Sequence, residues 1–194
     1  MFEEVADQIR VLPLLDRNVC QGLIDAADHL SLWCDAMVDG GPGSGIVVDR
    51  RARSAELISE YWLPALFDHV RPAIEARFTK QLSSTASPRF GLSSLQIIRY
   101  RPGGHHAVHA DSGLDDGRGS TRWRRYSVVC YLNNEFDGGH TRFSGLDMRV
   151  KPPPGHCVLF PASYFHAGEP VLAGTKYILT TYLGDPTTMP EDAS

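Results

Sequence analysis

The sequence predicts a mainly β protein with supporting N-terminal helices and a jelly-roll core, that is, a double-stranded β-helix. From Gly91 onward, short runs of strand-forming residues alternate with Gly/Pro turns, as in sandwiches and barrels. Before Gly91, most hydrophobic residues follow a helical spacing. The size agrees, since 194 residues with 42% hydrophobic and 22% charged residues are most simply one domain with a buried core.

The first helix is predicted from its N-cap and its hydrophobic spacing. A short extended segment at Val11–Leu15 precedes Asp16, which is a suitable N-cap for a helix that runs to about Leu30. The apolar positions of this helix are Leu15, Cys20, Leu23, Ile24 and Ala27. Residues 38–53 are rich in Gly and Arg, and we expect a loop there with one short strand at Ile46–Val48.

A second helical pattern follows. Ser54 is expected to cap it, and the pattern continues to Leu82. Its first apolar positions are Leu57, Ile58, Tyr61 and Trp62. Because Pro64 and Pro72 lie inside the pattern, we expect two or three shorter helices or a kink. Residues 83–90 have the composition of a linker.

Strands are expected throughout residues 91–185, the predicted jelly-roll core. The expected strands are Leu95–Arg101, His105–Asp111, Arg125–Asn133, His140–Phe143, Met148–Lys151, His156–Phe160, Tyr164–Gly168 and Lys176–Leu183. Residues 1–90 would form a helical support region against one face of this core. Residues 186–194 are expected to be a frayed tail, and together the three parts make a single domain over residues 1–194.

Net charge and cysteine spacing indicate which partners and which cellular compartment to expect. A formal charge of −4 gives no reason to expect binding to nucleic acid or to an anionic membrane. The N-terminal sequence MFEEVADQIR is acidic and has no apolar core of signal-peptide length. The four cysteines show no zinc-like spacing and are expected to be reduced thiols of a cytoplasmic protein: Cys20, Cys34, Cys130 and Cys157. The sequence does not indicate an oligomeric state.

The histidines point to a metal site. Six of the eight lie between positions 105 and 166, and His109 is followed two residues later by Asp111. Residues two apart on a strand point to the same face, so this imidazole and this carboxylate can converge on one point. They supply two of the three ligands of the two-histidine, one-carboxylate set that holds non-haem Fe(II). His166, which follows a turn and precedes an apolar strand, is the candidate for the third ligand.

A lysine on a late strand would complement this metal site. Lys176, Ile178, Thr180 and Tyr182 share one face of the last predicted strand. A lysine on the inner face of an apolar barrel is costly unless it meets an anion. Lys176 could instead be the exposed first residue of its strand. Its distance from His166 along the chain suits a dicarboxylate that chelates the metal at one end and pairs with the ammonium group at the other.

From about Leu95 to Gly184 the sequence resembles the catalytic domain of the prolyl 4-hydroxylase-like Fe(II)/2-oxoglutarate dioxygenases. The motifs that carry the resemblance are YRPGG at 100–104, HAD at 109–111, YLN at 131–133, GGHTRF at 138–143, PPPG at 152–155, Phe160, His166 and GTK at 174–176. The resemblance implies a jelly-roll fold, with His109, Asp111 and His166 as the iron ligands. It also implies Fe(II) as the cofactor and 2-oxoglutarate and O2 as co-substrates.

The resemblance also implies which residues hold 2-oxoglutarate. Lys176 matches the basic residue that pairs with the distal carboxylate of this co-substrate. Tyr131 matches a tyrosine that donates a hydrogen bond to the same carboxylate, and an interior tyrosine does need a partner for its hydroxyl. Tyr100 matches a tyrosine that lines the co-substrate site, and Thr141 would add a hydroxyl.

Substrate contacts are expected where the sequence departs from the family. His106 stands where the family often has a tyrosine, and Tyr182 where prolyl hydroxylases often carry tryptophan. Residues 112–126 could form a lid over the site, with Trp123 and Arg124 as substrate contacts. The arginines of this segment that could meet an acidic group are Arg118, Arg122, Arg124 and Arg125. A solvated loop with scattered charge is the alternative interpretation.

The expected activity is hydroxylation of an aliphatic C–H bond with release of succinate and CO2. A small molecule (an amino acid or a natural-product intermediate), a short peptide and a prolyl peptide are all compatible as substrates, and the last would make the chain a peptidyl prolyl 4-hydroxylase proper. A non-catalytic, cupin-like metal-binding module is the alternative from a different class. A metal-dependent isomerase or a 2-oxoglutarate-independent dioxygenase is the enzymatic alternative. Lys176 and Tyr131 separate these classes, because a plain metal binder needs no buried anion-binding pair.

Overall fold

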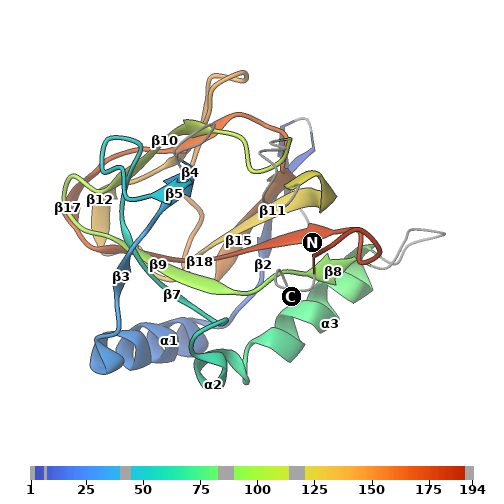
Figure 1. Ribbon diagram of the computed structural model, residues 1–194, viewed down its shortest axis with the longest axis horizontal. Coiled ribbons are helices and arrows are strands. Elements are labelled where there is room, and N and C mark those ends of the chain that lie inside the picture. Colours follow the sequence, from blue (N-terminus) through green and yellow to red (C-terminus); the bar gives the residue numbers. More distant parts are fainter. Residues whose placement is uncertain (1–2, 7, 40–44, 83–89, 114–120, 191–194) are drawn as a thin grey trace.

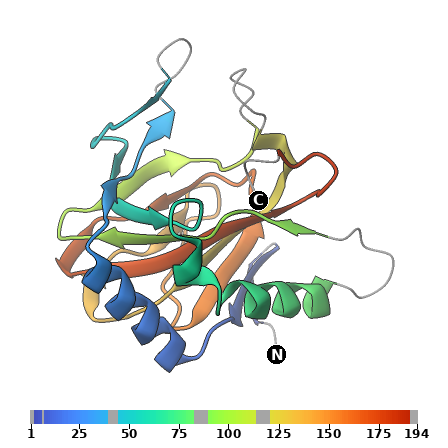
Figure 2. The ribbon, with the colours of Figure 1, turned by 60° about the horizontal axis from the view of Figure 1, so that its bottom comes forward.

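The computed structural model describes residues 3–6, 8–39, 45–82, 90–113 and 121–190 (Figures 1 and 2). These residues form three α-helices and one short 3-10 helix: α1 (Arg17–Leu30), α2 (Pro64–Phe67), α3 (Arg71–Leu82) and η1 (Thr121–Trp123). The remaining regular structure is β, and all pairings between strands are antiparallel.

The larger sheet has nine strands. In spatial order they are β1 (Glu3–Ala6), β2 (Ile9–Pro13), β15 (His156–Pro161), β11 (Arg124–Tyr131), β18 (Lys176–Gly184), β9 (Gln96–Tyr100), β7 (Glu56–Ser59) and β3 (Cys34–Asp35), with β8 (Gly91–Leu92) also paired to β18. The last long strand, β18, therefore lies in the middle of the sheet between β11 and β9. Its inner-facing residues are consequently held by neighbours on both sides.

A smaller sheet of five strands faces the first. Its order is β14 (Met148–Val150), β13 (Thr141–Phe143), β16 (His166–Gly168), β10 (His105–His109) and β6 (Arg53–Ser54). Two short pairs complete the strands: β12 (Phe136–Gly138) with β17 (Val171–Gly174), and β4 (Val38–Asp39) with β5 (Ile46–Val47). Two facing antiparallel sheets confirm the predicted jelly-roll core.

Two hydrophobic cores lie on the two faces of the large sheet. One is formed with the helices, which cover a single face of that sheet (Figures 1 and 2), and includes Phe67, Ile74 and Leu179. The other lies between the two sheets and includes Phe160 and Ile178. Ile178 and Leu179 are neighbours on β18 and belong to different cores, because successive side chains of a strand point to opposite faces.

The prediction of a helix that begins at Ser54 is wrong. In its place the chain forms β6 and then β7, and β7 pairs with β9 through Leu57↔Ile98 and Ile58↔Ile97. Leu57 contributes to the core between the sheets and Ile58 to the core under the helices. A strand buried on both faces has consecutive apolar residues, so its sequence resembles that of a buried helix. The predicted helical support region therefore also contains strands.

The other helical predictions are confirmed. Helix α1 begins directly after Asp16, although the Asp16 side chain makes no capping hydrogen bond. Its buried residues are Cys20, Leu23, Ile24 and Ala27, four of the five that were expected. Pro64 begins α2, and Pro72 lies in the first turn of α3, so the prolines do divide the helical pattern.

Each of the eight predicted strands is present, with ends shifted by one or two residues in most cases. The short strands β8, β12 and β17 were not predicted. Most of the expected linker, residues 83–89, and the last part of the expected tail, residues 191–194, lie outside the described residues. In the part of the chain that the structure describes, no helix is both long enough and apolar enough to cross a membrane.

Candidate active site

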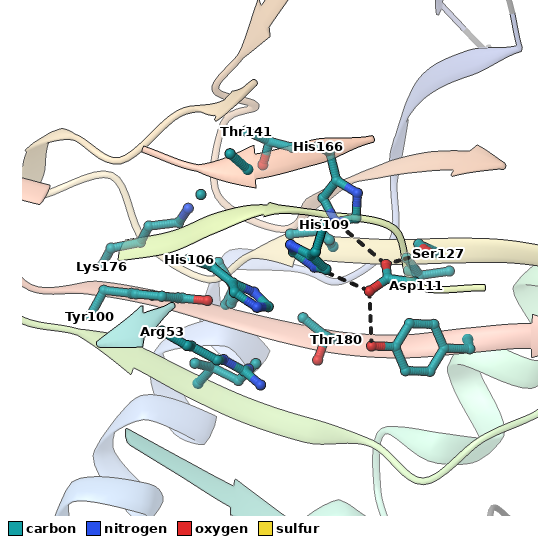
Figure 3. Close-up of a pocket in the computed structure, with 17 residues that line it drawn as sticks. Arg53, Tyr100, His106, His109, Asp111, Ser127, Thr141, His166, Lys176 and Thr180 are labelled. Atoms are coloured by element: carbon teal, nitrogen blue, oxygen red, sulfur yellow. Dashed lines mark hydrogen bonds and ion pairs between the residues drawn. The ribbon is translucent and has the colours of Figure 1, made fainter. Parts of the chain in front are cut away.

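Two strands of the smaller sheet bring His109, Asp111 and His166 together (Figure 3). His109 ends β10 and is the Cα partner of His166 at the start of β16. Asp111 follows two residues later and reaches both rings. Its carboxylate oxygens lie 3.3 Å from His109 Nε2 and 3.4 Å from His166 Nε2. One ligand atom from each residue lies within 4.8 Å of the other two, and this is the one such cluster found among the described residues.

Backbone carbonyls orient both imidazoles for metal binding. His109 Nδ1 lies 2.8 Å from the carbonyl oxygen of Ala107, and His166 Nδ1 lies 3.0 Å from that of Tyr164. Because a carbonyl can only accept, each Nδ1 carries the proton and each Nε2 keeps its lone pair. Burial also lowers the pKa of His166, which favours the neutral ring that a metal needs.

Asp111 is held as a buried carboxylate. Ser127 Oγ donates to its Oδ2 at 2.6 Å, and the Tyr182 hydroxyl lies 3.4 Å from its Oδ1. Burial alone would raise the pKa of Asp111, but its close approach to His109 and His166 and the hydrogen bond from Ser127 lower it below its usual value. Arg124 fixes the backbone at the same point by donating to the Asp111 carbonyl at 3.1 Å.

Fe(II) suits this donor set. Two neutral imidazoles and one carboxylate that converge on one point form a facial triad, which leaves positions open for other ligands. The side-chain and backbone contacts behind each ligand are those that hold a metal site in shape before the ion arrives.

Lys176 lies inside the protein, so the alternative that it is an exposed strand end is excluded. Only 2% of its surface is exposed, and Nζ donates to the Gly139 carbonyl at 2.6 Å and to the Tyr131 hydroxyl at 3.3 Å. No carboxylate pairs with it among the described residues. Burial, with a smaller contribution from the charge of Lys151, lowers the pKa of Lys176 to about 7. A buried ammonium group without an anion is suited to bind one.

Hydroxyl groups surround the same ammonium group. The Tyr131 hydroxyl lies 2.9 Å from Thr141 Oγ1, and the Tyr100 ring centre lies 5.3 Å from Lys176 Nζ. Gly139 permits this packing, because a Cβ there would lie 3.1 Å from Lys176 Cδ and its φ is +63°. Tyr131 is fully buried and does not itself line the pocket, but it contacts Lys176 and Thr141, which form a polar end of the pocket suited to a carboxylate.

One pocket connects the metal triad with Lys176. Besides these four residues, its lining includes Tyr100, Thr141, His106 and Tyr182. On β18, Lys176, Ile178, Thr180 and Tyr182 all face this pocket, as the strand alternation predicted. The triad and the ammonium group lie toward opposite ends of the pocket in Figure 3. The pocket can therefore hold one molecule that reaches both, which is the property that 2-oxoglutarate requires.

Two of the expected substrate contacts lie in the pocket and two do not. His106 stacks on His109 with 3.6 Å between ring centres, and burial together with its neighbours lowers the pKa of His106 to about 2. Trp123 is buried beside Gly184 instead of lining the pocket, because η1 turns its ring under the end of β18. Arg124 stacks on the ring of Tyr182 at 3.9 Å from its centre and does not line the pocket either.

The segment expected to be a lid is only partly described. Residues 114–120, with Arg118, lie outside the described residues, so the lid stays a prediction. Arg122, Arg124 and Arg125 line a second cavity and not the pocket of the triad.

Sequence reasoning missed three polar residues of the pocket: Arg53, Ser127 and Thr180. Ser127 could have been found, because it shares a strand face with Tyr131 four residues later on β11. Thr180 was placed on the correct face of β18 but was given no role. Arg53 carried no sequence signal, because it lies in a segment that was expected to be a loop.

Comparisons with known proteins agree with this geometry. The family model of the 2OG-Fe(II) oxygenase superfamily matches residues 95–184. The "Putative prolyl 4-hydroxylase" of Acanthamoeba polyphaga mimivirus is 30% identical over 182 residues, which are 85% of this chain and 69% of that protein. The chain belongs to the 2OG-Fe(II) oxygenase superfamily. It is an enzyme of the prolyl 4-hydroxylase-like group, and Fe(II), 2-oxoglutarate and O2 are its cofactor and co-substrates.

Other relatives share a smaller part of their length with this oxygenase. The rat multifunctional procollagen lysine hydroxylase and glycosyltransferase LH3 is 26% identical over 94% of this chain, which spans 24% of that protein. A PKHD-type hydroxylase of Sphingopyxis alaskensis is 31% identical over 45% of this chain, and the match spans 42% of that protein. This oxygenase therefore corresponds to only part of these two proteins.

Solved structures confirm the fold of the oxygenase. The viral collagen prolyl hydroxylase of Paramecium Bursaria Chlorella virus-1, in a 2OG complex, has a TM-score of 0.65 at 20% identity and covers 93% of this chain and 97% of that one. A Pseudomonas putida prolyl-4-hydroxylase has a TM-score of 0.59 at 20% identity and covers 91% of this chain and 92% of that one. These two structures therefore share the fold of this oxygenase over most of its length.

Proposed function

We propose that this oxygenase hydroxylates an aliphatic C–H bond of a small molecule (an amino acid or a natural-product intermediate) or of a prolyl peptide. One oxygen atom of O2 enters the substrate as a hydroxyl group. The other enters succinate as 2-oxoglutarate loses CO2. The observation that carries the proposal is a single pocket in which a His–Asp–His triad and a buried lysine without an anionic partner face the same space.

In this proposal Fe(II) binds to His109, Asp111 and His166. When bound, the ion supplies the redox chemistry that activates O2. The side chains fix its coordination beforehand. Backbone carbonyls set the tautomer of both histidines, and Ser127 together with Tyr182 holds the carboxylate.

Lys176 would bind the distal carboxylate of 2-oxoglutarate. The ammonium group is buried, so a charge-assisted hydrogen bond to a carboxylate is strong there. Tyr131 and Thr141 place two further hydroxyls at the same end, and Tyr100 forms the wall beside it. The co-substrate would thereby be oriented with its keto-acid end toward the triad.

The substrate would approach on the side of His106 and Tyr182. The His106 ring stays neutral and packs against a metal ligand, so it shapes the site without adding charge. Trp123 and Arg124 would act behind the site instead of touching the substrate, Trp123 by supporting the end of β18 and Arg124 by positioning Tyr182 and Asp111.

Relatives support a prolyl peptide as one possible substrate. One relative carries the name of a prolyl 4-hydroxylase. A Trichoplax adhaerens prolyl hydroxylase with a TM-score of 0.63 was solved in complex with a hypoxia inducible factor peptide fragment.

We also propose that the oxygenase works in the cytoplasm without a nucleic-acid or membrane partner. Its four cysteines are free thiols, three of them buried, as is usual for proteins of reducing compartments. Fractionation of cells that express the tagged protein tests this location, and recovery in a secreted fraction would contradict it.

One experiment separates the proposed activity from its alternatives. Anaerobic addition of 2-oxoglutarate to the Fe(II) protein should produce the visible absorption band of the Fe(II)–keto-acid chelate. Succinate release is then measured with amino acids, proline peptides and host metabolites. A metal-binding module would give no band, and a 2-oxoglutarate-independent dioxygenase would consume O2 without forming succinate.

A further inference from the structure

Arg53 lies in the active-site pocket, and none of the roles described above uses it. It is the first residue of β6, the edge strand of the smaller sheet, and its Cα partner on β10 is His106. Figure 3 shows its side chain below His106 and close to Tyr100, away from the triad and from Lys176. The family model matches residues 95–184, so Arg53 lies outside the part of the chain that this model covers.

The guanidinium group of Arg53 lacks the carboxylate partner that five other arginines among the described residues have. No carboxylate pairs with it among the described residues, and its buried Nε has no hydrogen-bond partner there. By contrast, Arg71 lies 2.6 Å from Glu60 and Arg99 lies 2.8 Å from Glu56. The other arginines with a carboxylate partner are Arg50, Arg101 and Arg149. A partly buried guanidinium group without an anion is costly.

Tyr100 and His106 lie beside Arg53 (Figure 3). Arg53 lies close enough to the Tyr100 hydroxyl that its charge and a hydrogen bond lower the pKa of this tyrosine, although burial has the larger effect and raises it. His106 is the Cα partner of Arg53 on β10, and Tyr182 lines the same pocket. The positive field of Arg53 therefore covers the space between His106 and Tyr182, where a substrate would enter.

The charged groups of the loaded pocket do not balance, because one positive charge remains without a negative one. Its lining contains two cations, Lys176 and Arg53, and one carboxylate, Asp111. Fe(II) and 2-oxoglutarate carry opposite double charges, and Lys176 balances Asp111. Arg53 is then the remaining charge, and an anion from another molecule would balance it.

We propose that Arg53 binds a carboxylate of the substrate, so that the substrate carries a carboxylate near the carbon that is hydroxylated. This inference rests on the proposed function and names its substrate class. The guanidinium fork can donate two parallel hydrogen bonds to a carboxylate. The carboxylate must lie near the reacting carbon because Arg53 and the triad line the same small pocket. It can be the α-carboxylate of an amino acid or an acidic side chain of a short peptide.

Lys176 and Arg53 would therefore bind different carboxylates. Lys176 has the hydroxyl of Tyr131 beside it, with Thr141 next to that, and is fully enclosed. Arg53 is only partly buried and lies at the strand pair formed by β6 and β10. An enclosed site suits a co-substrate that stays the same in every turnover, whereas a partly open one suits a substrate that arrives last.

Binding is tested with the Mn(II)-loaded protein and saturating 2-oxoglutarate, since Mn(II) accepts the same nitrogen and oxygen donors. Isothermal titration compares matched pairs: L-proline with L-prolinamide, L-leucine with L-leucinamide, and amide-capped Ala-Pro-Glu with Ala-Pro-Gln. At least one carboxylate compound should bind about tenfold to a hundredfold more tightly than its amide, the range for a hydrogen bond to a charged group. The first two pairs report an α-carboxylate, and the third reports an acidic side chain.

Variants then assign the preference to Arg53. Arg53→Met should remove the difference between the carboxylate and its amide, and Arg53→Lys should restore part of it because the charge returns without the fork. Melting of the ligand-free protein gives a second measurement. Arg53→Met should not lower the melting temperature, whereas Arg99→Met should lower it, because Arg99 has two carboxylate partners.

Three results would overturn the proposal. The first is a panel in which no carboxylate binds more tightly than its amide. The second is a preference that Arg53→Met leaves intact. The third is a loss of 2-oxoglutarate affinity in Arg53→Met as large as in Lys176→Met, which would make Arg53 part of the co-substrate site. Failure of wild-type Mn(II) protein to bind 2-oxoglutarate would instead contradict the proposed function, so the two failures are distinguishable.

Discussion

Binding of 2-oxoglutarate should weaken steeply as the pH rises above 7. Burial lowers the pKa of Lys176 to about 7 in the ligand-free protein, so its side chain loses its proton above that pH. The distal carboxylate needs the ammonium form, and it should raise the pKa of Lys176 again once bound. Binding above pH 7 therefore takes up one proton.

The expected size follows from this linkage. Deprotonation of Lys176 multiplies the apparent dissociation constant by 1 + 10^(pH − pKa), where the pKa is that of Lys176. With a pKa of about 7, the factor is about 2 at pH 7 and about 100 at pH 9, so affinity should fall about 50-fold over this interval. Because of the same depressed pKa, the free energy of unfolding of the ligand-free protein should rise as the pH increases from 7 to 10.5, since the unfolded chain binds the extra proton throughout that window.

Isothermal titration of the Mn(II) protein with 2-oxoglutarate at several pH values measures this dependence. Repeating it in buffers with different ionisation enthalpies counts the protons taken up. Lys176→Arg is the matched control, because a guanidinium group keeps its charge throughout this range and the profile should become flat. Equal affinity of the wild-type protein at pH 7 and pH 9, or the same slope in Lys176→Arg, would refute the reasoning.

Four further predictions concern the triad, the co-substrate end and the packing. Asp111→Ala should abolish Fe(II) binding in equilibrium dialysis and turnover with it; full succinate production by this variant would contradict the metal assignment. Tyr131→Phe should raise the dissociation constant of 2-oxoglutarate about five- to tenfold, for one lost hydrogen bond, and change Fe(II) affinity little; an unchanged constant would make Tyr131 only a packing residue. Gly184→Ala should lower the free energy of unfolding by about 3 kcal/mol in denaturant titration, because its Cβ would lie 2.1 Å from the Trp123 carbonyl oxygen. Gly22→Ala in α1, which meets nothing within 4 Å, should raise it by about 1 kcal/mol, and a loss would contradict the open space seen there.

The metal triad and the buried lysine could be predicted because most of their geometry is local to single strands. His109 and Asp111 are two apart on a strand and must share a face. Lys176 and Tyr182 share a face of β18 by the same alternation, and the structure places both in the pocket. Only the return of His166 to the same point depended on the order of the strands, and the resemblance to a known family supplied it.

The segment from Ser54 to Ser59 shows why the first part of the fold was harder to predict. Its apolar residues are consecutive because Leu57 and Ile58 face two different cores. Periodicity cannot separate such a strand from a buried helix, and the length of the pattern favoured the helix. Pairing with β9, about forty residues later, decides the outcome, and single-sequence patterns do not contain it.

Arg53 and Trp123 show the same limit at the level of side chains. Both lie in segments without a clear period, so the direction of each side chain depends on how its segment packs. β6 pairs with β10 and thereby turns Arg53 into the pocket, whereas η1 turns Trp123 into the core. The more conspicuous residue in the sequence thus has a packing role, and the less conspicuous one lines the active site.

A crystal structure of the protein grown anaerobically with Mn(II) and 2-oxoglutarate would locate both the metal ion and the co-substrate. We expect a metal ion bound to His109 Nε2, His166 Nε2 and an Asp111 oxygen. We also expect 2-oxoglutarate to chelate this ion and its distal carboxylate to accept a hydrogen bond from Lys176 Nζ. A metal ion held by other residues, or a distal carboxylate bound to Arg53 with Lys176 still paired only to Gly139 and Tyr131, would contradict these expectations.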